Sequence, residues 1–196
     1  MCNNFLKIIN DKYSGVITLK EALKNGINRT VLQKMLDQDL VEKIGYGLYS
    51  TKDFVYDEFY IFQLKHPNIV FSYNTALYFW GMTERTPTRM DITTNRNNSL
   101  NYCKDDVNLY RVNKDILNLG KVQAKTPTGK IVNCYNLERT VCDVINNRKN
   151  IDIEIANKAI KSSIRSKGFN SNLMFEYAEK LKIYEKVESY MEAIMW

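Results

Sequence analysis

The stretch Thr18–Tyr49, TLKEALKNGINRTVLQKMLDQDLVEKIGYGLY, decides how the first quarter of this 196-residue chain folds. Thr18 precedes an amphipathic run and Glu21 lies three residues later, which is the spacing of a capping box at the start of a helix. Asn25 and Gly26 end that helix, because glycine tolerates the left-handed backbone of a helix C-terminus. The pattern predicts a short helix between these two signals.

A second helix follows, and its two faces differ in character. Asn28 is suited to cap it through the side-chain oxygen, and Ile27 is expected to be buried in the turn. The face expected to meet the core consists of Leu32, Met35 and Leu36. The opposite face consists of Thr30, Gln33, Lys34 and Asp37.

A hairpin is predicted after the second helix. Leu40–Ile44 alternates partly at period two, Gly45–Gly47 is a turn, and Leu48–Ser50 resumes the strand. Helix, turn, helix and hairpin together are the order of a winged helix-turn-helix. Such patterns also recur in protein-interaction modules, so that alternative stays open at this point.

In the DNA-binding interpretation, the second helix meets base edges and phosphates with its first turn and exposed face. The hairpin tip, with Tyr46 beside Lys43, is expected to contact the phosphate backbone or the minor groove. Asp37 is unsuited to a phosphate and is expected at the rim of the groove. The candidate DNA-binding residues are Lys20, Lys24, Arg29, Thr30, Gln33, Lys34, Lys43 and Tyr46.

Composition bounds the remaining possibilities. The net charge of +6 permits nucleic-acid binding without requiring it, and 44% hydrophobic residues are ordinary for a globular protein. No apolar run approaches the ~20 residues that cross a bilayer. The cysteines show no Cys-x-x-Cys spacing, so we expect free thiols in a reducing cytoplasm. The four cysteines are Cys2, Cys103, Cys134 and Cys142.

We expect two domains, residues 1–53 and residues 54–196. The second is predicted as a larger α+β domain with a mainly antiparallel sheet and a helical C-terminus. Its predicted strands are residues 69–71, 90–94, 107–112, 120–125 and 131–135. Its predicted helices are residues 54–65, 73–81, 137–145, 151–165, 172–181 and 185–195.

Signals for catalysis are weak. Pro127–Lys130 reads PTGK, but Ala124 and Ile131 stand where a phosphate loop needs Gly and Ser or Thr, so a hairpin turn is favoured. His66 is the only histidine, which disfavours a zinc site or a Cys–His nucleophile pair. We therefore expect no enzyme activity, no metal and no cofactor.

Three further groups of side chains have plain interpretations. Arg139 and Asp143 stand at i, i+4 beside Glu138, which favours an ion-pair face at the surface or between lobes, with a partner-contact surface as the alternative. The aromatic residues 73–80 near Arg85 and Arg89 are expected in the core rather than stacked on bases. A basic stripe on one helix is interpreted as a solvated face; it consists of Lys158, Lys161, Arg165 and Lys167.

The chain resembles the AbiEi antitoxins of bacterial type IV toxin–antitoxin systems, which are linked to abortive phage infection. Three stretches carry the resemblance: residues 17–49, SYNTALYFWGMTERTP at residues 72–87, and YNLERTVCDVI at residues 135–145. The last contains the motif residues Glu138, Arg139, Thr140 and Asp143. Related proteins often place Arg just before the wing glycine, whereas here Ile44 precedes Gly45 and Lys43 would supply the charge.

The resemblance implies a winged domain that binds inverted repeats in its own promoter and represses the operon. It implies a second domain that counteracts an AbiEii-like nucleotidyltransferase toxin, without a stable complex. We expect a monomer or weak dimer that binds DNA cooperatively. The alternatives are a stand-alone winged helix regulator with a ligand-sensing C-terminal domain, and an enzyme whose C-terminal lobe acts on nucleic acid or nucleotides.

Overall fold

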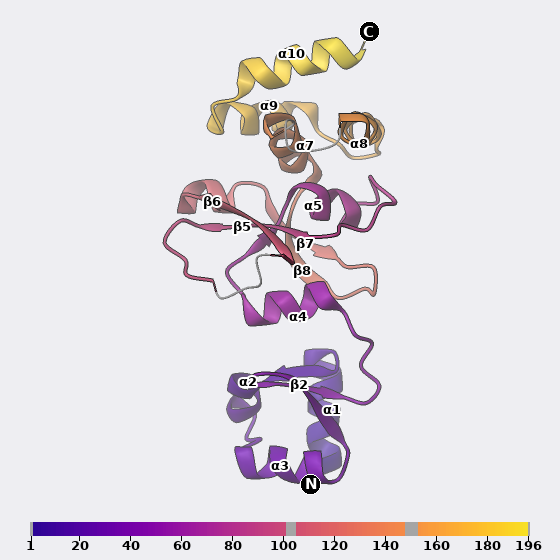
Figure 1. The fold of residues 1–196 in the computed structure, drawn as a ribbon, viewed down its shortest axis with the longest axis vertical. Helices are drawn as coiled ribbons and strands as arrows, with labels where there is room; N and C mark the ends of the chain where they lie inside the picture. The colour runs from indigo at the N-terminus through magenta and orange to yellow at the C-terminus, as the bar shows by residue number, and fades with distance from the viewer. Residues whose placement is uncertain (1, 101–104, 148–152, 196) are drawn as a thin grey trace. The chain divides into compact units, whose positions relative to one another are not determined.

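The chain folds as an α+β protein with two sheets whose strand pairs are mostly antiparallel (Figure 1). The computed structural model describes residues 2–100, 105–147 and 153–195. It divides into two compact units, Met1–Asp57 and Glu58–Trp196. The boundary expected after residue 53 lies four residues before this division. Cys103, expected as a free thiol, lies outside the described residues.

The first unit pairs three helices with a small antiparallel sheet of order β1-β3-β2. Its helices are α1 (Cys2–Tyr13), α2 (Leu19–Lys24) and α3 (Arg29–Asp37). Its strands are β1 (Val16–Thr18), β2 (Val41–Gly45) and β3 (Leu48–Thr51). Strand β1 was not predicted, because three residues are too few to show an alternating pattern.

Both predicted helix caps are confirmed. The Thr18 hydroxyl accepts a hydrogen bond from the Glu21 amide at 3.2 Å, and the Glu21 carboxylate accepts one from the Thr18 amide at 2.9 Å. The Asn28 side chain accepts one from the Val31 amide at 2.9 Å. Ile27 is fully buried in the turn between the two helices, as predicted. These local signals fix where α2 and α3 begin.

The second unit contains a five-stranded sheet of order β6-β5-β4-β8-β7 with helices packed around it. Its strands are β4 (Val70–Phe71), β5 (Met90–Asn95), β6 (Val107–Val112), β7 (Lys121–Lys125) and β8 (Ile131–Tyr135). Its helices are α4 (Glu58–Lys65), α5 (Tyr73–Phe79), α6 (Lys114–Asn118), α7 (Leu137–Asn146), α8 (Ile153–Arg165), α9 (Ser171–Lys180) and α10 (Tyr184–Met195).

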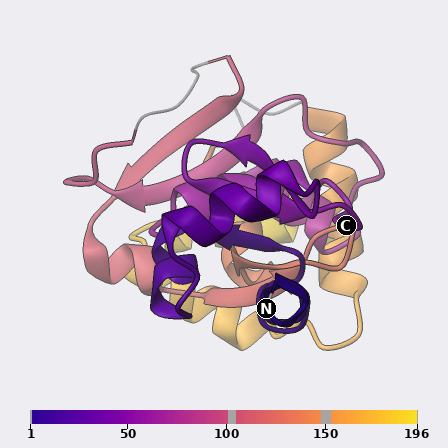
Figure 2. The ribbon, with the colours of Figure 1, turned by 90° about the horizontal axis from the view of Figure 1, so that it is seen from below.

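The larger sheet is mixed rather than mainly antiparallel. Strands β4 and β5, and β7 and β8, pair antiparallel, whereas β4 pairs with β8 and β5 with β6 in parallel. Strands β5 and β6 lie side by side in Figures 1 and 2. The connection between them returns the chain to the same end of the sheet, so Met90 stands opposite Val107. Strand patterns alone do not reveal such a return.

Helix α4 begins at Glu58, so the prediction of a helix from Phe54 is wrong at that end. The Phe54 amide donates to the Thr51 carbonyl at 3.1 Å. The Phe54 ring approaches Gly15 so closely that a β-carbon there would lie 3.4 Å from it. Phe54 is therefore held by the first unit, and the helix starts only after the chain has left that unit.

Helix α5 joins two hydrophobic cores in the second unit. Ala76 packs in a core with Phe59, Phe71 and Ile92, beside the sheet. The next residue, Leu77, packs in a second core shared by α7, α8, α9 and α10. Figure 1 shows α5 between the sheet and these C-terminal helices. The helical layer is thus anchored to the sheet through two faces of one short helix.

Gly120 provides a test of this packing, because it follows α6 with a φ of +74°. A β-carbon there would lie 2.6 Å from the Arg139 Cβ and 2.8 Å from the Asn136 Oδ1. Besides the backbone strain, overpacking of this kind costs about 1–3 kcal/mol. We expect Gly120→Ala to lower the free energy of unfolding by that much more than Gly129→Ala. Urea unfolding followed by tryptophan fluorescence measures it, since both tryptophans, Trp80 and Trp196, belong to this unit.

Gly129 is the matched control. Its φ is +83°, but a β-carbon there meets no atom within 4 Å, so alanine there has only the backbone cost. Equal losses of stability in the two variants would show that contact with Arg139 does not restrict position 120.

Candidate functional site

The outward face of α3 gathers the polar residues singled out in the sequence. Leu32 and Met35 are buried in the core of the first unit, so the opposite side of the helix faces solvent. All eight candidate residues of this unit are exposed; they are Lys20, Lys24, Arg29, Thr30, Gln33, Lys34, Lys43 and Tyr46. Their side chains are accessible to a macromolecular partner.

The cations on this surface are available for a new partner. Within the described ranges, no carboxylate oxygen lies within 4 Å of the side-chain nitrogens of Arg29, Lys34 or Lys43. Lys52, by contrast, pairs with Asp39 at 2.5 Å. Arg29 stands in the first turn of α3, where the helix dipole adds partial positive charge. The arrangement favours an anionic ligand at the start of α3.

The helix carries one internal polar contact on the same face. The Gln33 side-chain amide donates to Asp37 Oδ1 at 2.8 Å. The Gln33 carbonyl oxygen stays free to accept, and one amide hydrogen stays free to donate. Asp37 is the exposed acid on this face; it is the last residue of α3, and its hydrogen bond draws its side chain back toward Gln33, one turn earlier.

The β2–β3 hairpin presents a fully exposed tyrosine. Tyr46 lies in the turn between the strands and is 100% exposed. The adjoining Gly47 carbonyl accepts a hydrogen bond from the Leu19 amide at 2.7 Å, which fixes the turn beside the start of α2. Lys20 and Lys24 project from α2 one turn apart and share a face. The first unit therefore offers cations on two helices and on the hairpin.

The motif in the second unit lies in the interior. Glu138, Arg139 and Thr140 are 7%, 2% and 0% exposed, and Asp143 is 6% exposed. The predicted i, i+4 pair forms, with Arg139 Nε donating to Asp143 Oδ1 at 2.9 Å. The expectation that this pair lies at the surface is wrong, because α7 is packed between α5 and the helices that follow it.

Two of the motif residues, Glu138 and Arg139, tie α7 to other segments. Arg139 also donates to the carbonyls of Ile116 at 2.9 Å and Leu119 at 3.0 Å, and its guanidinium lies 4.4 Å from the centre of the Tyr135 ring. Glu138 accepts a hydrogen bond from the Asn170 amide at 3.0 Å, at the start of α9. The Thr140 hydroxyl donates to the Asn136 carbonyl at 2.8 Å. These contacts are those of a structural junction.

In the buried pair, only one oxygen of the Asp143 carboxylate has a hydrogen-bond partner among the described residues. Burial raises the pKa of the Asp143 carboxyl, and the Arg139 charge opposes that rise. Asp143 Oδ1 is bonded to Arg139, whereas no described group donates to Oδ2. The carboxylate therefore depends on one guanidinium for its charge partner.

Other groups of possible chemistry are inert in this fold. Burial raises the pKa of the Cys134 thiol, and it raises that of Cys142 to about 12, so both thiols stay protonated at neutral pH. Residues 126–130 form a hydrogen-bonded turn between β7 and β8, as predicted. No group of three potential metal-binding side chains exists among the described residues. No described helix is long and apolar enough to cross a membrane.

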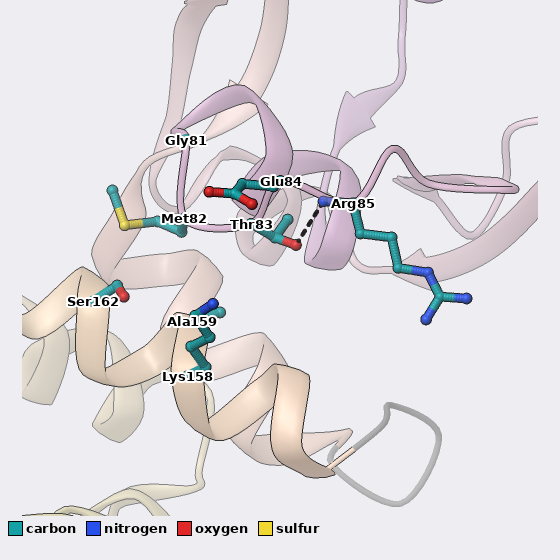
Figure 3. A pocket seen from close by; sticks show the side chains of 8 residues that line it. All are labelled: Gly81, Met82, Thr83, Glu84, Arg85, Lys158, Ala159 and Ser162. Atoms are coloured by element: carbon teal, nitrogen blue, oxygen red, sulfur yellow. Dashed lines mark hydrogen bonds between the residues drawn. The ribbon is translucent and has the colours of Figure 1, made fainter.

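A pocket in the second unit was not anticipated. It has a volume of about 340 Å³ and lies between the turn at residues 81–85 and helix α8 (Figure 3). Lys158 and Ser162 line it from the helix. Residues so distant in sequence give no spacing signal, and Lys158 was interpreted only as part of a solvated basic stripe.

The Arg139 pair generates a stability prediction. Breaking a buried pair leaves an uncompensated charge, so Arg139→Met should lower the free energy of unfolding by about 3–5 kcal/mol. The exposed pair of Arg89 and Asp105, at 3.6 Å, is the comparison, and Arg89→Met should cost at most about 1 kcal/mol. Urea unfolding followed by tryptophan fluorescence measures both.

The pH dependence of stability in Arg139→Met shows whether the unpaired Asp143 carboxylate causes the instability. Without Arg139, burial raises the pKa of Asp143 unopposed, so the folded state binds a proton more readily than the unfolded state. Relative to the unaltered protein, Arg139→Met should then regain stability as the pH falls from about 7 to about 5. Asp143→Leu added to Arg139→Met should remove that pH dependence. If the loss of unfolding free energy in Arg139→Met stays constant over this pH range, lost contacts rather than the unpaired Asp143 carboxylate cause the instability.

Comparison with known proteins finds a similar fold but no similar sequence. No family model and no curated protein matches the sequence. The fold is similar to the crystal structure of the RV2827C protein from Mycobacterium tuberculosis, with a TM-score of 0.51, 9% identity, and coverage of 95% of this chain and 76% of that one. At this identity the likeness concerns the fold and carries no function.

Proposed function

We propose that this protein is a DNA-binding antitoxin of a type IV toxin–antitoxin system. The first unit is a winged helix-turn-helix, with α3 as the recognition helix and the β2–β3 hairpin as the wing. It binds inverted repeats in the promoter of its own operon and represses transcription. The second unit counteracts a nucleotidyltransferase toxin, with no catalytic activity or cofactor of its own and no stable complex. The protein acts in the cytoplasm.

The observation that carries the DNA-binding half is the exposed basic face of α3. Arg29 and Lys34 are solvent-exposed and lack carboxylate partners among the described residues, while Thr30 and Gln33 offer hydrogen-bonding groups between them. Arginine and lysine bind phosphates and guanine edges, and glutamine reads adenine. Tyr46 and Lys43 extend the surface at the hairpin. This surface meets the chemical requirements of major-groove recognition with a flanking wing contact.

The antitoxin half rests on the resemblance of residues 72–87 and 135–145 to the AbiEi family. The second unit has an independent core, which is consistent with a separate task. A stand-alone regulator with a ligand-sensing second domain is the alternative, and the pocket beside α8 is the observation that favours it. A toxin gene adjoining this one would favour the antitoxin.

The recognition surface predicts how binding responds to substitution and salt. Lys34→Ala and Arg29→Ala should each weaken binding to the upstream DNA and lower the magnitude of the log–log salt slope by about one unit. Tyr46→Ala should weaken binding while leaving the salt slope unchanged, since no charge is lost. Gel shifts at several salt concentrations measure both effects.

Lys180→Ala is the control, because Lys180 is an exposed cation on α9 outside the first unit. The log–log salt slope of DNA binding by Lys180→Ala should match that of the unaltered protein. If Arg29→Ala and Lys34→Ala leave promoter affinity unchanged, α3 is not the recognition helix.

The division of labour predicts the result of co-expression with the neighbouring toxin gene. Residues 58–196 alone should restore growth without repressing the promoter, because they form the second compact unit. Residues 1–57 alone should repress without restoring growth. Growth and a promoter–reporter readout measured in the same cells separate the two activities. Rescue by residues 1–57 would reverse the assignment.

A further inference from the structure

The pocket beside α8 combines separated opposite charges with free hydroxyl groups. Glu84 and Lys158 line it from opposite walls, and no ion pair within 4 Å joins them in the part of the chain that the structure describes. Figure 3 shows Lys158 directed from α8 toward the turn at residues 81–85, while the Arg85 side chain points away from Met82. The walls hold opposite charges apart, and a ligand with an anionic end and a donor end can bridge them.

Hydrogen-bond donors line the pocket from both the turn and α8. The Thr83 hydroxyl accepts from the Arg85 amide at 3.2 Å, which leaves its own hydrogen free to donate. The Ser162 hydroxyl has no partner among the described residues, whereas the neighbouring Ser163 is buried and donates to the Ala159 carbonyl at 2.8 Å. Lys158 adds a full positive charge, and Arg85 lies at the rim.

The charge balance and the size select the ligand class. Lys158 is the cation directed into the pocket and Glu84 is the carboxylate of its lining, while Arg85 adds positive charge only at the rim, so a ligand whose anionic end meets Lys158 is favoured. The carboxylate of Glu84 only accepts hydrogen bonds, so the ligand must also carry donors such as sugar hydroxyls. A volume of about 340 Å³ lies at the small end of the range for small-molecule sites.

We propose that this pocket binds a small phosphorylated sugar, either free or as part of a nucleoside monophosphate. The phosphate lies against Lys158, Ser162 and Thr83, and the sugar hydroxyls donate to Glu84. The site is independent of the DNA-binding face proposed for the first unit, because its lining belongs to the second unit alone.

Isothermal titration calorimetry of the full chain with ribose 5-phosphate, AMP and inorganic phosphate tests the proposal. Lys158→Ala should weaken all three by about tenfold or more, the usual value of a charged hydrogen bond. Lys161→Ala removes the same charge from the same helix outside the pocket lining and should change affinity by less than about twofold. Circular dichroism confirms that each variant is folded.

Glu84→Gln should change the affinities for inorganic phosphate and for ribose 5-phosphate differently. Inorganic phosphate should bind the variant more tightly, since a repulsive charge is lost, whereas ribose 5-phosphate should bind it more weakly relative to inorganic phosphate. If AMP binds no more tightly than ribose 5-phosphate, the base lies outside the pocket. If AMP binds more tightly, the nucleotide is the ligand.

Three results would overturn the proposal. One is the absence of saturable binding of any probe at about 1 mM, which is the weak limit for a specific small-molecule site. Another is equal weakening by Lys158→Ala and Lys161→Ala, which would mean diffuse attraction to the basic helix. The last is tighter binding of serine than of ribose 5-phosphate, because a zwitterion would then satisfy the two charges better.

Discussion

The buried pair of Arg139 and Asp143 is the interaction on which the second unit depends. A guanidinium in the interior requires partners for its donors, and Arg139 finds them in one carboxylate and two backbone carbonyls. The carbonyls belong to Ile116 and Leu119, so the pair fixes the chain between α6 and β7 against α7. Gly120 is required at that crossing because a β-carbon would strike Arg139. One charged side chain thus sets how the sheet and the helical layer meet.

The hydrophobic core that α7 shares with α5 and α8 holds the walls of the pocket. The turn at residues 81–85 follows α5 directly, and Leu77 of α5 packs in the core that contains α7 and Ala159 of α8. Ala159 also lines the pocket beside Lys158. The pocket walls are therefore anchored by one hydrophobic core, which holds the backbone segments from which Glu84 and Lys158 extend. A ligand that bridges them meets a site formed before it binds.

Sequence reasoning predicted best where the signals are local. The Thr18–Glu21 box, the Asn28 cap and the β7–β8 hairpin each depend on residues a few positions apart, and each is present. The parallel pairing of β5 with β6 and the lining of the pocket depend on distant residues and were missed. The burial of Arg139 was missed for another reason: an i, i+4 ion pair has the same spacing on a surface helix as on a buried one.

That burial changes how the resemblance bears on function. Glu138, Arg139, Thr140 and Asp143 are among the residues by which the second unit resembles the AbiEi antitoxins, yet their side chains are buried within the fold. Side chains buried in this way do not contact a toxin or a nucleic acid, so the motif identifies a scaffold. Any recognition by the second unit must use exposed groups, and the pocket of Glu84 and Lys158 is such a group. In the first unit the relation is reversed, because its candidate residues are exposed and the buried ones only hold them in place.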